Sequence, residues 1–301
     1  MRFKSLDLNL LVALDALLAH RSISRAAEAV FLTQSGMSGA LSRLRAYFDD
    51  ELLIQVGRSL ELTPLAESIA QPVREVLLSI ESQIVNRPTF DPATDDHTYR
   101  IMVSELTLIL LMPALTQRLA REAPNIRLHV LSQHDRAVEA LERGELDLLV
   151  LPEQVASASH PCEKLYEENY DCLVWTGNTT IGETLLFEEY LEAGHISVEF
   201  GPNRVAAFDG WFLEQHGVNR RVELICTSLI APPVLVVGTQ RIATVHRRLA
   251  NLAAQYLPVR VLNAPMKIPP LNQMVQWHKH RDSSPALVWL RKVLVEEAAK
   301  L

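Results

Sequence analysis

The sequence predicts a helical winged helix-turn-helix with a long linker helix, followed by a larger α/β region built from two units. Apolar residues recur at helical spacing up to about Val85, and the next segment, Asn86 to Asp96, is mostly polar and holds two prolines. Beyond this segment, strand-like and helix-like stretches alternate, which is typical of parallel α/β sheets. With 301 residues, the chain has room for two or three domains.

The overall composition, 48% hydrophobic and 22% charged, is that of an ordinary soluble globular protein. The net charge of −7 argues mildly against a nucleic-acid partner when the chain is taken as a whole. Residues 1–87, however, hold 9 Lys and Arg against 10 Asp and Glu, so most of the negative charge lies in the rest of the chain. Attraction to a phosphate backbone should therefore be modest and sensitive to salt. The cations available to phosphates in this part are Arg2, Lys4, Arg21, Arg25, Arg43, Arg45 and Arg58.

The three cysteines show neither a paired metal-ligand spacing nor a disulfide framework, which fits a reducing cytoplasm. The N-terminus has the basic start and apolar run of a signal peptide, but Asp7 and Asp15 interrupt that run. The apolar segment from Leu106 to Leu115 is too short to span a bilayer and is interpreted as a buried helix. We therefore expect a cytoplasmic protein without a membrane partner.

Three short helices are predicted at the N-terminus from their apolar stripes and capping residues. The second runs from Ser22 to Val30, with Ser22 or Ser24 as its cap, and a short turn leads to a third helix that Thr33 caps and Gln34 opens. Two short helices joined in this way make a helix-turn-helix, whose second helix enters the major groove of DNA. The inward-facing residues are Leu10, Leu14, Leu17 and Leu18 in the first helix, Ala26, Ala27 and Val30 in the second, and Met37, Ala40, Leu41, Leu44 and Phe48 in the third.

The third helix places small polar residues opposite its apolar stripe. Each glycine inside a helix costs about 1 kcal/mol relative to alanine, a cost that a closely apposed partner would justify. Such a partner is either the major groove or a neighbouring helix, and this stretch alone leaves the two alternatives equal. The helix-turn-helix context favours the groove. The residues on this face are Ser35, Ser38, Gly39, Ser42 and Arg43.

A small hairpin and a long helix follow. The segment before Pro64 alternates around Gly57, which indicates the wing, and Thr63 with Pro64 then begins a helix that runs to about Val85. Its apolar residues follow a coiled-coil-like spacing, which favours pairing with a second copy of the chain over packing on its own domain. Two DNA half-sites also need two recognition helices. Pro72 should kink one turn. The seam residues are Ile69, Val73, Val76, Ile80 and Ile84.

The region beyond the linker predicts two α/β units and a closing strand and helix. Two such units in one continuous region suggest a cleft between them, because ligands bind outside the carboxyl ends of parallel strands. The first unit is expected to hold strands at 99–104, 126–132 and 146–152 with helices at 106–124 and 136–144; the second lies between 170 and 264, and a strand at 272–280 and a helix at 284–300 close the chain.

The N-terminal run from Leu6 to Leu53 resembles the LysR-type transcriptional regulators. It shares with them the small residues of the second helix, the Ser/Thr-Gln-Ser start of the recognition helix, and a serine one turn later. It departs from them at Gly36 and Gly39, at Leu53 in place of a common phenylalanine, and at Gln55, which leaves Arg58 as the phosphate contact in the wing. The resemblance implies DNA contacts by Ser22, Arg25, Thr33, Gln34, Ser35, Ser38, Ser42, Arg43, Arg45 and Arg58.

The resemblance also implies a domain plan. Residues 1–63 would form the winged helix-turn-helix, 64–86 the dimerisation helix, and 87–301 an effector domain like the periplasmic binding proteins. Lobe I would take about 90–165 and 267–301, and lobe II about 166–266. Within the family the chain is most similar to the flavonoid-responsive nodulation activators, with regulators of aromatic and chloroaromatic degradation closely similar. Both branches imply a small planar aromatic inducer.

Eight residues are expected to bind the effector. Ser104 and Thr227 follow strands, where a hydroxyl suits a phenolic or anionic ligand, although Ser104 would serve equally well as a simple helix cap. Arg204 could pair with a carboxylate or phenolate, and His246 titrates near neutral pH, but a solvated arginine and a structural histidine are the simpler interpretations. The resemblance implies that Leu110 and Leu111 line the pocket and that Tyr170 takes the place of a ligand-facing polar aromatic residue that could donate a hydrogen bond. Trp277 offers a stacking surface. Leu110, Leu111 and Trp277 could equally be core residues.

No motif for an enzyme is present, neither a nucleophile elbow nor a phosphate-binding or dinucleotide-binding glycine loop. His278 and His280 lack an acidic or cysteine partner, so no metal site and no cofactor is expected. We therefore predict a regulator, an activator of an aromatic or chloroaromatic degradation operon, with a flavonoid-responsive nodulation activator as the alternative. A solute-binding protein or α/β enzyme whose N-terminal helices mediate assembly is the alternative from another class. Expected partners are duplex DNA, a small aromatic effector, a homodimer or homotetramer, and RNA polymerase.

Overall fold

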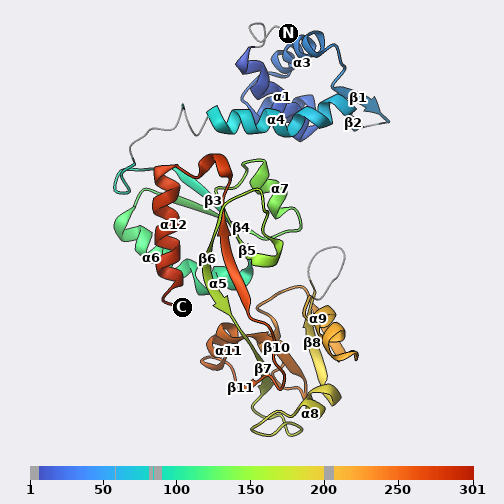
Figure 1. Cartoon of the computed structure of the whole chain (residues 1–301), viewed down its shortest axis with the longest axis vertical. Coiled ribbons are helices and arrows are strands. Elements are labelled where there is room, and N and C mark those ends of the chain that lie inside the picture. The colour runs from blue at the N-terminus through green and yellow to red at the C-terminus, as the bar shows by residue number, and fades with distance from the viewer. Residues whose placement is uncertain (1–6, 58, 81–83, 85–89, 200–206) are drawn as a thin grey trace. The chain divides into compact units, whose positions relative to one another are not determined.

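The computed structural model describes residues 7–57, 59–80, 84, 90–199 and 207–301, so Arg58 and Arg204 lie outside the described residues. The chain divides into two compact units, Met1–Thr89 and Phe90–Leu301, each of which is considered by itself (Figure 1). Within the described residues, no helix has both the length and the apolar character needed to cross a membrane.

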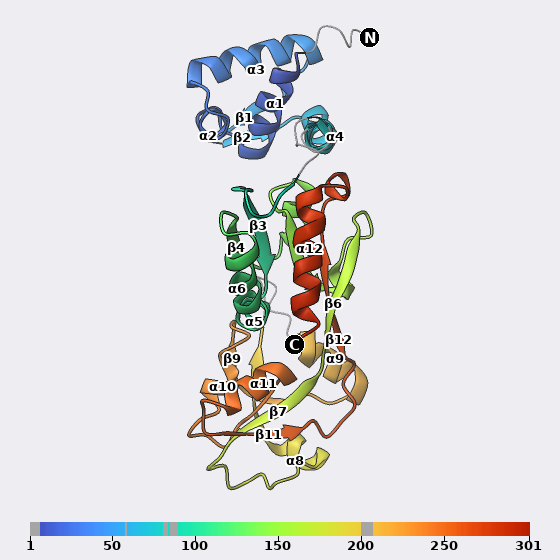
Figure 2. The ribbon, with the colours of Figure 1, turned by 90° about the vertical axis from the view of Figure 1, so that its left-hand side faces the viewer.

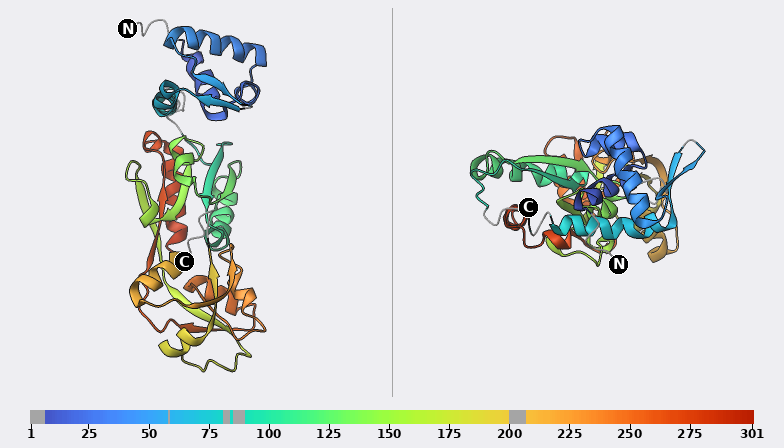
Figure 3. Two further views of the ribbon diagram at one scale, coloured as in Figure 1. Left: turned by 90° about the vertical axis from the view of Figure 1, so that its right-hand side faces the viewer. Right: turned by 90° about the horizontal axis from the view of Figure 1, so that it is seen from above.

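The first unit is a three-helix helix-turn-helix with a hairpin and a long helix. Thr33 caps α3 as predicted, since its Oγ1 accepts the N–H of Gly36 at 3.1 Å, and Ser22 rather than Ser24 caps α2. The hairpin extends away from the helices (Figure 3). The elements are α1 (Leu8–His20), α2 (Ile23–Ala29), α3 (Gln34–Phe48), β1 (Leu53–Val56), β2 (Ser59–Leu62) and α4 (Pro64–Ile80).

The core of this unit joins all four helices. Met37 and Leu44 of α3 are fully buried together with leucines of α1. Ile69 and Val73 of α4 also pack on this core, so the first half of the predicted dimerisation seam is used within the unit. In contrast, 47% of Val76 is exposed, and only the second half of the seam is open to a partner.

Lobe I of the second unit is a five-stranded sheet in the order β4-β3-β5-β12-β6. Strands β3 (Thr98–Val103), β4 (Arg127–Ser132) and β5 (Leu148–Pro152) are parallel, whereas β12 (Leu271–Gln276) runs antiparallel to β5 and to β6 (Cys162–Glu168). Helix α12 lies along this lobe beside α6 (Figure 2). The other elements are α5 (Glu105–Leu110), α6 (Met112–Glu122), α7 (Ala137–Glu142), η3 (Glu153–Val155), η4 (Lys279–Arg281) and α12 (Pro285–Ala298).

Lobe II repeats this plan with the order β11-β7-β10-β8-β9. Strand β8 pairs in parallel with β9 and β10, while β7 pairs antiparallel with β10 and β11. The elements are β7 (Tyr170–Trp175), α8 (Phe187–Glu192), β8 (Gly194–Val198), α9 (Ala207–His216), β9 (Arg221–Cys226), α10 (Pro232–Leu235), β10 (Ile242–His246), α11 (Arg247–Ala254) and β11 (Val259–Asn263).

Three predictions for this unit are wrong in detail. The sheets are mixed rather than purely parallel, because the chain crosses between the lobes and returns in the opposite direction. The helix expected over 106–124 is two helices, since Pro113 has no N–H to donate to Ile109 and the turn before it opens at Leu111. Strand β6 was not predicted at all.

Candidate DNA-binding surface and effector cavity

The polar face of α3 is open to solvent along its length. Ser35, Ser38, Gly39, Ser42 and Arg43 are all exposed, whereas the apolar stripe on the other side is buried. No heavy atom lies within 4 Å of the position that a Cβ at Gly39 would take. Apart from a hydroxyl contact of 3.2 Å between Ser35 and the cap Thr33, the structure describes no hydrogen bond from the side chains of this face within the unit, and the face is available to an external partner.

The start of α3 explains the second glycine of this helix. A Cβ at Gly36 would approach the Oγ1 of Thr33 to 3.1 Å, the same oxygen that accepts the Gly36 N–H. Glycine therefore relieves crowding at the cap. Helix α3 contains no acidic residue, so its first turn, with its free N–H groups, and its exposed face both favour an anion such as a phosphate.

Arg45 occupies a different place from the other expected DNA contacts. Its guanidinium donates to the carbonyl oxygens of Glu51 (2.8 Å) and Leu53 (2.9 Å), and so ties α3 to the hairpin. Arg25 and Arg43 are exposed, and within the described residues neither makes an ion pair. Ser22 caps α2, and Gln34 is exposed in the first turn of α3.

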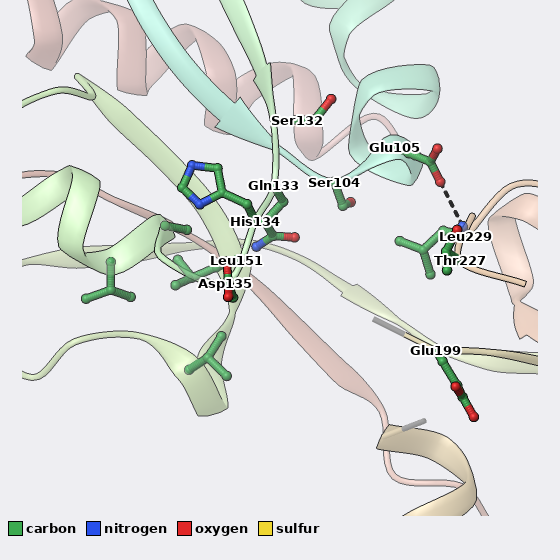
Figure 4. A pocket seen from close by; sticks show the side chains of 13 residues that line it. Ser104, Glu105, Ser132, Gln133, His134, Asp135, Leu151, Glu199, Thr227 and Leu229 are labelled. Carbon is green, nitrogen blue, oxygen red and sulfur yellow. Dashed lines mark hydrogen bonds between the residues drawn. The ribbon is translucent and has the colours of Figure 1, made fainter. Parts of the chain in front are cut away.

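A cavity of about 590 Å³ lies between the two lobes of the second unit, at the carboxyl ends of their parallel strands (Figure 4). Strands β3, β4 and β5 supply one side, and the segments after β8 and β9 supply the other. This is where open α/β sheets bind ligands, because β3 and β8 each have later strands on both sides. The lining residues are Ser104, Glu105, Ser132, Gln133, His134, Asp135, Ala137, Val138, Leu151, Val155, Glu199, Thr227 and Leu229.

Glu105, the first residue of α5, is bonded to lobe II at the edge of this cavity. Its carboxylate accepts the hydroxyl of Ser228 at 2.9 Å and the backbone N–H of Leu229 at 2.7 Å. The neighbouring Ser104 caps α5 by accepting the N–H of Thr107, as the simpler interpretation had it, and also lines the cavity. Ser104, Thr107 and Tyr166 form a chain of hydroxyl contacts, each of 3.1 Å, that leads from the cavity to β6.

Helix α5 belongs to lobe I in sequence but packs in lobe II. Leu106 is buried in the lobe II core, and Leu110 packs against the same core. Leu111, one residue later, is fully buried in the lobe I core together with Trp277. The indole N–H of Trp277 donates to Asp282 at 2.9 Å. Leu110, Leu111 and Trp277 therefore lie in cores rather than at the cavity wall where we expected them.

Tyr170 and His246 contact each other inside lobe II and are not among the residues that line the cavity. Their ring centroids are 4.8 Å apart, and Tyr170 also contacts Phe208. Burial raises the pKa of Tyr170 to about 12 and lowers that of His246 to about 4, so both rings are neutral near pH 7. Thr227 lines the cavity as expected.

The cavity also contains polar residues that the sequence interpretation missed. Glu105, Asp135 and Glu199 bring three carboxylates to its lining, and Gln133 and His134 add an amide and an imidazole. Glu105, Gln133, His134 and Asp135 come directly after predicted strands, so the position after the strand was the available signal, whereas Glu199 follows β8, which ends at Val198. Among the described lining residues there is no lysine or arginine.

The paired histidines near the C-terminus begin a 3₁₀ turn rather than sharing a strand face. The Nδ1 atom of His278 accepts the N–H of His280, and the two rings lie 5.2 Å apart. Within the described part of the chain, no three His, Cys, Asp or Glu side chains are placed to hold a metal ion.

Comparison with known proteins identifies the family. Residues 93–299 match the LysR substrate binding domain, and residues 8–67 match the bacterial regulatory helix-turn-helix protein of the lysR family. The chain belongs to the LysR family. It is a LysR-type, DNA-binding transcriptional regulator, with a helix-turn-helix followed by a two-lobed substrate-binding domain.

Several relatives of this LysR-type regulator are nodulation proteins. It is 41% identical over 303 residues to nodulation protein D 1 of Rhizobium tropici, covering 100% of this chain and 98% of that protein. It is 40% identical over 301 residues to nodulation protein D of Bradyrhizobium sp. (strain ANU 289), covering 100% and 89%. Among solved structures it is similar to the probable transcriptional regulator PA0477 from Pseudomonas aeruginosa, with a TM-score of 0.65, 26% identity, and 99% and 98% of the two chains covered.

Proposed function

We propose that this LysR-type regulator is an activator of the nodulation type that responds to a neutral, polyhydroxylated aromatic compound such as a flavonoid. The single observation that carries the proposal is the interlobe cavity and its carboxylate-rich lining. The volume of about 590 Å³ falls within the usual range for small-molecule sites. The 38–41% identity to nodulation D proteins favours this class over regulators of aromatic degradation, which we expected first.

The charge of the lining argues for the kind of inducer. Glu105, Asp135 and Glu199 accept hydrogen bonds, which the phenolic O–H groups of a flavonoid would donate. The carboxylate of salicylate or of a ring-cleavage product would instead meet like charges. The apolar side chains of Val138, Leu151 and other lining residues suit an aromatic ring.

The mechanism that we propose is a shift between arrangements of the lobes. An inducer with more contacts in one arrangement favours it by its differential affinity, and the change would alter the spacing of the recognition helices in a dimer or tetramer. The outcome would be altered DNA bending and contact with RNA polymerase. DNA recognition would use the exposed face of α3, with Ser38 at its centre.

A thermal-shift screen followed by calorimetry tests the inducer class. Hydroxylated flavones and flavanones should raise the unfolding temperature of the purified chain, whereas salicylate and chlorobenzoates at equal concentration should not. If salicylate and chlorobenzoates raised the unfolding temperature and the flavonoids did not, the proposed inducer class would be overturned. In a gel-shift with the promoter next to the gene, a specific complex whose affinity falls with salt is expected, and the absence of such a complex would contradict the proposed operator binding.

A further inference from the structure

Phe31 lies in the turn between α2 and α3, and its backbone has a left-handed conformation with φ 56°. The N–H of Leu32 donates to the carbonyl oxygen of Ala27 (2.9 Å), and the N–H of Phe31 donates to that of Glu28 (3.3 Å). This pair of bonds is a Schellman motif, which ends α2 and requires a positive φ at the position of Phe31. Glycine or asparagine usually takes that position, because other side chains are strained there.

The ring of Phe31 gains nothing in return, since 98% of the residue is exposed. Other described residues with a positive φ have a visible compensation: Leu52 is buried in the core, Arg21 pairs with Glu61, and aspartate, as at Asp49, tolerates this conformation. The backbone strain lowers the stability of the unit by itself, and the exposed ring adds no burial that would offset it. Backbone strain of this kind is found mostly at functional sites. A contact between Phe31 and a partner outside the chain would explain why it is kept.

The position of Phe31 points to DNA as the partner. It stands two residues before Thr33, the cap of α3, and is continuous with the exposed face that begins at Ser35. An apolar side chain beside a recognition helix can contact the C5-methyl group of thymine, which projects into the major groove. We propose that Phe31 is a base-reading residue that contacts a thymine methyl at one edge of each half-site. This proposal rests on α3 being the recognition helix.

The test compares the full-length chain with its Phe31→Asn variant. Asparagine adopts the left-handed conformation readily but has no ring. The probe is a duplex that the wild-type chain selects from a random-sequence library. We expect the variant to unfold at a higher temperature than the wild type, yet to bind the selected duplex about tenfold more weakly while binding to a random duplex is unchanged. Deoxyuridine lacks the C5-methyl group of thymine, so the thymines of the selected duplex are replaced by it one at a time. At the thymine that Phe31 contacts, the replacement should weaken wild-type binding about fivefold and leave binding of the variant unaffected.

Tyr256→Asn provides the control, because it removes a 78% exposed aromatic ring from the second unit and should leave both affinities unchanged. Equal affinity of the wild type and Phe31→Asn for the selected duplex would overturn the proposal. The proposal would also be overturned if Phe31→Asn lost affinity equally for the selected and the random duplex. The same holds if the wild type and the variant responded identically to every deoxyuridine replacement, since the ring would then not read a methyl group. Failure of the wild-type chain to select any duplex would instead contradict the proposed role of α3.

Discussion

Glu105 of lobe I accepts the backbone N–H of Leu229 of lobe II at 2.7 Å, and the same carboxylate oxygen accepts the hydroxyl of Ser228. Glu105 and Leu229 both line the cavity in which we place the effector. A ligand hydroxyl that competes for Glu105 would therefore act directly on the bonds that hold the start of α5 to lobe II.

Replacing Glu105 with alanine should lower the free energy of unfolding. Hydrogen bonds to charged groups contribute about 1.5–3 kcal/mol, and because Glu105 is exposed we expect a smaller loss, about 1 kcal/mol. Urea unfolding followed by circular dichroism measures it. Glu145→Ala removes an exposed carboxylate of lobe I and is the matched control. The same midpoint for wild type and Glu105→Ala would mean that the connection contributes nothing.

The α3 surface gives a second prediction. Ser38→Glu places a carboxylate on the exposed face that we expect to meet phosphates, so specific binding to DNA should be lost while the fold and the response to ligand are kept. Gel-shift and thermal unfolding together separate the two effects. Ser159→Glu, on an exposed turn of the second unit, should leave DNA binding intact. An operator complex that survives Ser38→Glu would argue against α3 as the DNA-binding face.

Self-association should depend on the open half of the α4 seam. Val76 is 47% exposed and Ile84 76% exposed, whereas Val73 is buried within its own unit. Val76→Asp should therefore dissociate the dimer without unfolding the monomer, and sedimentation velocity would show a smaller species. Val76→Ala is the milder control and should remain associated. If Val76→Asp keeps the wild-type sedimentation coefficient, the chains associate through another surface.

His246 predicts a particular dependence of stability on pH. Burial lowers its pKa from 6.5 to about 4, so the unfolded chain takes up a proton near pH 6.5 and the folded chain only near pH 4. The free energy of unfolding should therefore fall as the pH is lowered through this window, by an amount on the order of 3 kcal/mol at its lower end. Above pH 6.5 the group contributes no slope. His246→Phe, which keeps a ring against Tyr170, should make the profile measured by urea unfolding shallower. A slope should remain, because burial also lowers the pKa of His278 to about 4; an unchanged slope would contradict this account.

The N-terminal unit was predictable because its signals are local. Apolar spacing gives the helices, and the caps Ser22, Thr33 and Thr63 fix where they begin through bonds to residues three positions later. Strand β6 was not predictable in the same way. Three of its residues in a row are exposed, and it pairs antiparallel with β12, which lies far away in the sequence.

The candidate cavity was predicted in position but only partly in composition. The rule about carboxyl ends of strands placed Ser104 and Thr227 correctly at its lining. The rule does not give the direction of each side chain, and His246, at the end of β10, contacts Tyr170, which the resemblance had placed at the ligand. Trp277 fills the core because its large ring and indole N–H find their partners there.

The packing of α5 in the lobe II core has a mechanical consequence. Because Leu106 and Leu110 are held by lobe II and Leu111 by lobe I, α5 should travel with lobe II whenever the lobes move. Two of the joints between the lobes would then lie at the ends of this short helix, at Ser104 and Leu111, and a lobe II excised along the sequence would lose the leucines of α5 from its core.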